Sequence, residues 1–209
     1  MIDKKVKEFI PNIPNFQCHY IEDFITALKK VDSMYYTYTT SKKVTKYPER
    51  VFAYELYHQF RIIMARKKDI YKDVHLNGEQ TKSREVVEDL ERCAPDLILH
   101  KSLFECSPEG QLWLCEIKMK NNNDAMKDLR KFSKMEKLNF PVYIFLYAGV
   151  TFKEMIKQIE EENQKRKIKC AHKIICISAY NQAGTKQFRC CRLEEIIKNT
   201  RMRVGNKRE

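Results

Sequence analysis

The chain has 209 residues, a length that suits one globular domain, and 43% of them are hydrophobic, enough for a sizeable core. No segment approaches the roughly 18 uninterrupted apolar residues of a membrane span, and the N-terminus lacks the apolar stretch of a secretory signal. Several of the eight cysteines lie among apolar neighbours, as reduced thiols do. We therefore expect a cytoplasmic protein without a membrane partner.

The charge of the chain is unevenly distributed. Lys and Arg total 40 against 28 acidic residues, a net charge of +12. Residues 1–117 carry 18 basic and 18 acidic residues, whereas residues 118–209 carry 22 and 10. A positive field confined to one half of the chain attracts a polyanion such as nucleic acid, with strong salt dependence. The alternative is a solvated basic surface that keeps the protein soluble.

The N-terminal part of the chain predicts helices. After a polar, proline-containing lead-in, a helix is expected over residues 21–30, and residues 34–46 are ambiguous between a strand and a loop. Pro48 occupies the first-turn position that tolerates proline, and an apolar stripe then continues a second helix to about residues 66–68. We expect residues 1–47 to form an extension that packs on a core domain of residues 48–209.

The middle of the chain predicts strands that are joined by turns. A strand over residues 73–76 leads to a turn at Asn77-Gly78, and residues 81–92 could be a loop or a further strand. Two apolar runs follow, APDLILH and LWLCEIKM, and the turn-forming segment 107–110 connects them.

The remainder of the chain alternates between helices and strands. Asp124 can cap a helix that reaches about residue 137, the apolar run 142–149 predicts a buried strand, and Thr151 caps a further helix. Strands are expected at 173–179 and 187–191. Hairpin-connected strands followed by alternating helices and strands predict a mixed sheet with helices on both faces, a three-layer α/β domain.

Charged residues interrupt the two central apolar runs and carry the main functional signal. Asp96 lies in the first run, and Glu116 and Lys118 lie near the end of the second. If the two strands pair, Asp96 and Glu116 can converge on one cation, and Lys118 shares a face with Glu116. Mg²⁺, for which Mn²⁺ can substitute, prefers carboxylates and phosphate, and the Ile117 carbonyl could add a ligand. Lys118 could orient or deprotonate a water, or stabilise charge on the phosphate.

Pro95-Asp96, followed by Glu116-Ile117-Lys118 with Glu116 twenty positions after Asp96, resembles the motif of the PD-(D/E)XK, or restriction-endonuclease-like, nuclease superfamily. The expected order of elements over residues 48–148 also resembles that family's core. The resemblance implies a restriction-endonuclease-like fold and a Mg²⁺-dependent nuclease that acts on nucleic acid, with DNA favoured. Its catalytic residues would be Asp96, Glu116 and Lys118. Many members of the family dimerise to cut two strands, so the resemblance also allows a homodimer.

Further site residues follow from the same resemblance. The family tends to place an acidic residue on the helix before the sheet, and Glu55 matches that position as a metal ligand; the alternative is an ordinary glutamate at the helix boundary. Glu79 and Lys82 could border the cleft. A polar or basic residue on the helix after the motif often faces the site, and the candidates here for phosphate contact are Lys127, Arg130, Lys131 and Lys134; the alternative is a solvated helix face. Lys120, if the motif strand continues that far, could contact the backbone of the nucleic acid, and Lys82 is a further candidate.

Each motif residue also has a structural interpretation. Asp96 could simply end a strand, and Glu116 and Lys118 could form an ion pair on an exposed sheet face. Because this superfamily contains non-catalytic members, the alternative function is a catalytically inactive nucleic-acid-binding or structural protein with a nuclease-like fold. Buried charges are costly without a function or a cation, which favours the enzyme.

Overall fold

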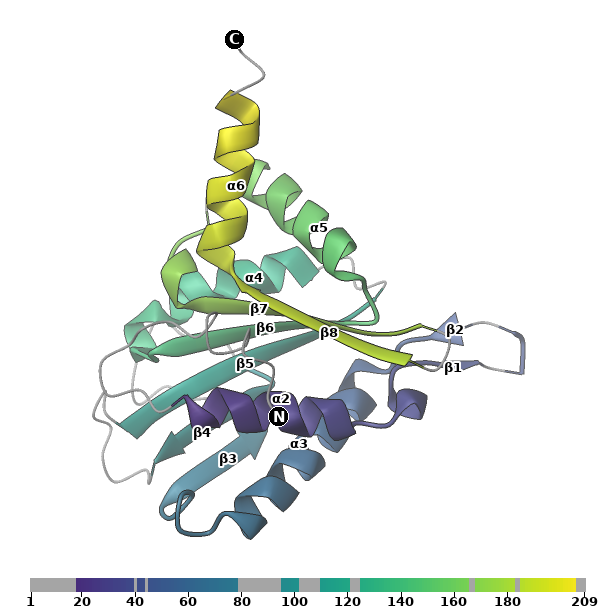
Figure 1. The fold of residues 1–209 in the computed structure, drawn as a ribbon, viewed down its shortest axis with the longest axis vertical. Helices are drawn as coiled ribbons and strands as arrows, with labels where there is room; N and C mark the ends of the chain where they lie inside the picture. The colour runs from purple at the N-terminus through teal and green to yellow at the C-terminus, as the bar shows by residue number, and fades with distance from the viewer. Residues whose placement is uncertain are drawn as a thin grey trace.

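A six-stranded mixed sheet forms the centre of the protein (Figure 1). The computed structural model describes residues 18–39, 41–43, 45–78, 95–101, 110–120, 125–165, 168–182 and 185–205. The strands lie in the order of the chain: β3 (Val74–Gly78), β4 (Leu97–Lys101), β5 (Gln111–Met119), β6 (Val142–Ala148), β7 (Ile174–Gln182) and β8 (Thr185–Arg192). β5, β6 and β7 run parallel, and the other neighbours in the sheet pair antiparallel.

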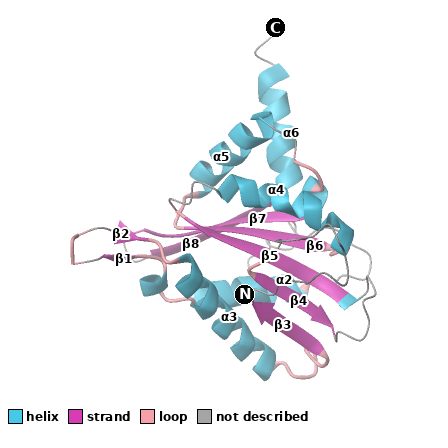
Figure 2. Ribbon diagram, turned by 180° about the vertical axis from the view of Figure 1, so that it is seen from behind, coloured by secondary structure: helices cyan, strands magenta, loops and turns pink. Residues whose placement is uncertain are grey.

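Helices cover both faces of this sheet (Figure 2). One hydrophobic cluster joins α2 (His19–Lys30) and α3 (Glu49–Arg66) to the first face. A second cluster joins α4 (Ala125–Met135), α5 (Phe152–Lys165) and α6 (Leu193–Gly205) to the opposite face. The predicted mixed sheet between two helical layers is therefore confirmed, while the restriction-endonuclease-like form of the core stays a prediction.

Helix α2 belongs to the same packed layer as α3. The ring of Phe24 contacts Trp113 of β5 and Phe60 of α3, with centroid separations of 5.3 and 6.5 Å. Lys186 of β8 then caps the C-terminus of α2, because its Nζ donates to the backbone oxygens of Lys29 and Val31 at 3.3 and 2.7 Å. These contacts tie residues that precede the predicted core domain to its sheet.

Short elements fill the segments between the main ones. The ambiguous tract before Pro48 contains the 3₁₀ turn η1 (Ser33–Tyr35) and a small antiparallel pair, β1 (Tyr38–Thr39) and β2 (Thr45–Lys46). Two more 3₁₀ turns, η4 (Glu136–Leu138) and η5 (Ala171–Lys173), precede β6 and β7. Within the described residues, no helix combines the length and the apolar content that a membrane crossing requires.

One prediction from the sequence was wrong, and one helix was not predicted. Asn77-Gly78 does not form a turn but continues β3, where Asn77 pairs with Ile98 and Gly78 with Leu97, so strand pairing overrides the local turn preference. The polar, basic C-terminal segment, for which the sequence predicted no element, forms α6, whose spacing of apolar residues allows Leu193 and Ile196 to be buried against the sheet. The predicted features at 79–94, 107–109 and 121–124, including Glu79 and Lys82, lie outside the described residues.

Candidate active site

Asp96 joins the two halves of the motif by a hydrogen bond to the backbone. Strand β4 begins at Leu97, which pairs with Cys115, so the last four residues of β5 extend beyond the end of β4. There the Ile117 N–H donates to Oδ2 of Asp96 at 2.6 Å. The Asp96 carboxylate thus takes the place of a strand partner and lies beside Glu116 and Lys118 of β5.

Glu116 places a second carboxylate in the interior at this end of β5. Its exposed fraction is 1%, and it follows the fully buried Leu114 on the same face of the strand. The pKa of the neighbouring Cys115 thiol lies well above its usual value, first because the thiol is buried and then because of the charges of Asp96 and Glu116, while Lys118 acts in the opposite direction. The site is therefore a region of concentrated negative charge to which Lys118 supplies a cation.

Lys118 connects the motif to helix α3. Its Nζ lies 2.8 Å from Oε1 of Glu49, in the first turn of that helix. The side chain of Lys118 is 9% exposed and that of Glu49 is 31% exposed, so the pair is largely shielded from water. β4 begins at Leu97, opposite Cys115, and so does not extend alongside Lys118. The side chain of Lys118 can therefore pass this end of β4 and reach α3.

Glu49, and not Glu55, is the acidic residue of α3 that contacts the motif. The Glu55 carboxylate accepts a hydrogen bond from Gln59 at 2.7 Å, and Glu55 is not among the residues that line the adjacent cleft. Glu55 is six positions after Glu49, which places the two glutamates about 120° apart around the helix axis. The role of Glu55 as a metal ligand stays a prediction, and these contacts do not support it.

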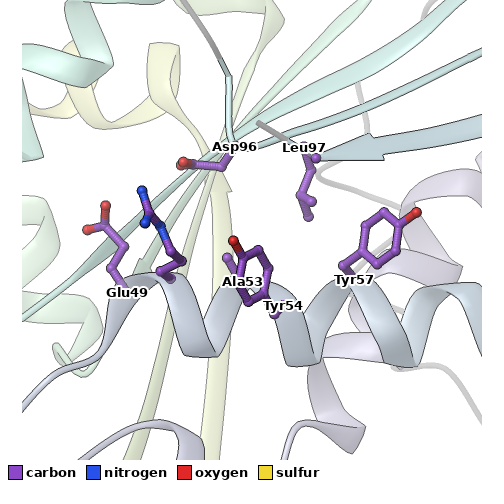
Figure 3. A pocket seen from close by; sticks show the side chains of 8 residues that line it. Glu49, Ala53, Tyr54, Tyr57, Asp96 and Leu97 are labelled. Carbon is purple, nitrogen blue, oxygen red and sulfur yellow. The ribbon is translucent and has the colours of Figure 1, made fainter. Parts of the chain in front are cut away.

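A cleft of about 550 Å³ opens between α3 and the ends of β3 and β4. In Figure 3, Tyr54 and Tyr57 lie on the side of α3 that faces Asp96 and Leu97, and Glu49 lies at the end of the row near the start of the helix. The cleft is lined by Glu49, Arg50, Ala53, Tyr54, Tyr57, Gly78, Asp96 and Leu97. Sequence reasoning identified only Asp96 of this set as a site residue, although Arg50, Tyr54 and Tyr57 share one side of the predicted helix.

The oxygen atoms of Asp96, Glu116 and the Ile117 carbonyl suit a hard divalent cation better than a transition metal. Within the described parts of the chain, no group of three or more His, Cys, Asp and Glu side chains is arranged to hold a metal ion. Mg²⁺ needs only one or two carboxylates because it keeps several waters. Asp96 and Glu116, with the Ile117 carbonyl on the same segment, supply oxygen ligands of the kind that this ion prefers.

The predicted basic residues differ in their surroundings. Lys120 directly follows β5 in the chain, and its backbone N–H donates to the backbone oxygen of Ala148 at 2.8 Å. On α4, Arg130 is engaged in an ion pair with Glu162 at 3.0 Å, whereas Lys127 and Lys134 are exposed and Lys131 is half-buried. Lys127 lies in the first turn of α4, the helix that follows the motif, and Lys134 lies about 10 Å further along the same helix. Lys120 and Lys127 are therefore the basic residues nearest to the motif in the chain, and Lys82 lies outside the described residues.

Comparison of the chain with models of known protein families, with curated proteins and with solved structures finds no match.

Proposed function

We propose that the protein is a metal-dependent nuclease that hydrolyses phosphodiester bonds, with DNA as the favoured substrate. The observation that carries the proposal is the hydrogen bond from the Ile117 N–H to Asp96. Asp96 directly precedes β4, and this bond joins it to the Glu116-Ile117-Lys118 segment of β5. This junction lies at the end of β5, beside a cleft. Two acids and a lysine gathered at one junction, where Asp96 lines the cleft, are a suitable set for phosphate chemistry.

The carboxylates would hold the metal. Asp96 and Glu116, with the Ile117 carbonyl, would bind Mg²⁺, and Mn²⁺ would substitute for it. A bound ion of this type supplies Lewis-acid polarisation of the phosphate and a more acidic water. The burial of Glu116 supports this role, because a carboxylate in an apolar interior is stabilised by a nearby cation.

Lys118 would stabilise negative charge that develops on the phosphate. Its ion pair with Glu49 holds the ammonium against a residue that lines the cleft, and a phosphate oxygen would approach it from there. A preorganised cation of this kind does not have to be reoriented when charge appears. Glu49 is therefore a positioning residue for Lys118.

The distribution of charge favours nucleic acid as the substrate. The excess of basic residues lies entirely after residue 117, and Lys120 and Lys127 follow the motif closely in the chain. Phosphate contacts from such residues give affinity that does not depend on sequence and that falls as the salt concentration rises.

The proposal is tested by cleavage assays with single-stranded and double-stranded DNA, and with RNA, in Mg²⁺, Mn²⁺ or EDTA. We expect metal-dependent cleavage of at least one substrate that falls by at least about 100-fold in Glu116→Gln and in Lys118→Met. Glu161→Gln, on the exposed surface of α5, is the matched control and should cleave normally. Cleavage that survives both site substitutions, or an absence of cleavage on every substrate, would contradict the proposal.

A second candidate function is nucleic-acid binding without turnover. It is favoured by the structural contacts of the motif, since Asp96 binds the Ile117 N–H and Lys118 binds Glu49. This function predicts salt-sensitive binding that is unchanged in Glu116→Gln, together with a melting temperature that does not respond to Mg²⁺ or Mn²⁺.

A further inference from the structure

Helix α3 presents two tyrosines to the cleft beside Asp96. Tyr54 and Tyr57 are three residues apart and therefore lie on the same side of the helix (Figure 3). The hydroxyl of Tyr57 donates to the Leu76 backbone oxygen at 3.3 Å, which anchors its ring to β3. The cleft thus has an aromatic wall that is held in place by the sheet.

Tyr54 has no role in the core that would explain an aromatic residue at its position. It is 58% exposed, whereas Phe52, Leu56 and Phe60 of the same helix are at most 1% exposed and carry the packing against the sheet. An exposed ring at the edge of a cleft offers its face to a flat ligand.

Gly78 widens the cleft opposite this wall. A Cβ atom at this position would lie 3.6 Å from the Asp96 backbone oxygen, 3.8 Å from Leu97 and 3.9 Å from Tyr57. These are ordinary contact distances, so a side chain could be accommodated there but would occupy the space between the tyrosine wall and Leu97. The glycine keeps that space open.

We propose that this cleft binds one unpaired base of a single-stranded nucleic acid, next to the phosphate at Asp96. The inference rests on the proposed function, which places that phosphate at the carboxylates. A volume of about 550 Å³ is within the range of about 300–1,000 Å³ that holds a small ligand, and it suits one nucleotide. The bases of a duplex have their faces stacked within the helix, so only an unpaired base can place its face on Tyr54. Stacking on tyrosine accepts every base, which predicts little sequence preference.

The test is a binding assay in EDTA, in which fluorescence anisotropy is recorded with labelled DNA of about 12 nucleotides. Three probes are compared: a single strand, a single strand of the same length with abasic sites, and a blunt duplex. We expect Tyr54→Leu to weaken binding of the base-bearing single strand by about ten-fold and Tyr54→Phe to preserve it, because phenylalanine keeps the ring. Binding of the abasic strand and of the duplex should be the same in both variants.

A second variant tests the cleft without removal of a ring. Gly78→Val adds a side chain that suits a strand and fills the space beside Tyr57, so it should weaken binding of the base-bearing strand and spare the abasic one. Circular dichroism and a melting curve for each variant show whether it is folded.

The outcomes separate this inference from the nuclease proposal. Equal binding of the base-bearing strand by wild type and Tyr54→Leu, an equal loss on all three probes, or no binding of single strands by the wild type would overturn the inference. If the protein cleaves DNA with Mg²⁺ while Tyr54→Leu binds normally, the base site fails and the nuclease stands. If binding depends on Tyr54 while no substrate is cleaved, the base site stands and the nuclease fails.

Discussion

Lys118 and Glu49 form an ion pair between the central strand β5 and the first turn of α3, with 2.8 Å between Nζ and Oε1 and 69 positions between them in the chain. The pair holds the start of α3 against the end of β5. Because α3 also supplies the aromatic wall of the cleft, this contact links Lys118 to the helix that carries that wall.

Loss of this ion pair should destabilise the fold. Glu49→Gln removes the charge of the carboxylate that is paired with Lys118, whose side chain is 9% exposed, and we expect the free energy of unfolding in urea to fall by about 1–3 kcal/mol. Glu55→Gln, on the same helix and with the same change of charge, is the control, and we expect a loss below about 0.5 kcal/mol. A larger loss for Glu55→Gln than for Glu49→Gln would show that the ion pair between Glu49 and Lys118 is not a main source of stability.

The same two variants discriminate between the candidate acids of α3 in catalysis. We expect Glu49→Gln to lower the cleavage rate more than Glu55→Gln, because Glu49 positions Lys118. The measurement is the metal-dependent cleavage rate as a function of substrate concentration. A loss of activity confined to Glu55→Gln would instead support the metal-ligand role that the family resemblance implies.

Docking of α2 should contribute strongly to stability. Phe24 is fully buried against Trp113 and Phe60, so Phe24→Ala removes a core ring and should cost about 3–5 kcal/mol. Unfolding can be followed by the fluorescence of Trp113, the only tryptophan. Met34→Ala, at a site that is 68% exposed, is the control and should have almost no effect. A small cost for Phe24→Ala would mean that α2 is not part of the cooperative core.

The buried thiols should resist alkylation at moderately alkaline pH. Burial raises the pKa of Cys115 and Cys176 well above the usual value of 9.0 and that of Cys170 to about 11. These thiols therefore stay protonated at pH 8.5, where the exposed Cys18 should react at least about 100 times faster with iodoacetamide. Peptide mapping after short pulses measures the order of reaction. Early alkylation of Cys115 would show that the end of β5 opens readily.

The cap of α5 gives a pH-dependent contribution to stability. The backbone N–H and the hydroxyl of Thr151 each donate to Oε2 of Glu154 at 2.8 Å, and these bonds, the backbone bond first, hold the pKa of Glu154 below its usual 4.5. A lowered pKa stabilises the fold above pH 4.5, and this contribution is lost as the pH falls through the folded-state pKa. Glu154→Ala should cost about 0.5–1 kcal/mol at pH 7 and less at pH 3. The control is Glu161→Ala; a cost for Glu154→Ala that does not change with pH would contradict this account.

The sequence predicted the fold best where long patterns of residues decided it. The apolar run of β6, the helical stripe of α3 and the Thr151 cap of α5 each have a local cause, and the structure confirms all three elements. Asn77-Gly78 was misassigned because its strand conformation depends on pairing with β4, 20 residues away in the chain. Local preference cannot reveal such a partner.

The candidate site was predicted in part for the same reason. Asp96, Glu116 and Lys118 interrupt apolar runs, which is visible in the sequence, and their convergence follows from the pairing of two neighbouring strands. Which of the two glutamates, Glu49 or Glu55, contacts the motif depends on the rotation of α3 about its own axis relative to the sheet. That rotation is set by tertiary packing, and both glutamates suit the N-terminal half of a helix.

The cap that Lys186 places on α2 also has a consequence for how the protein folds. The hydrogen bonds to the backbone oxygens of Lys29 and Val31 span 157 and 155 positions. Contacts of such long range raise the contact order and slow folding, because a large loop has to close before they form. During synthesis, α2 receives this cap only after most of the chain has left the ribosome, so its layer is completed late.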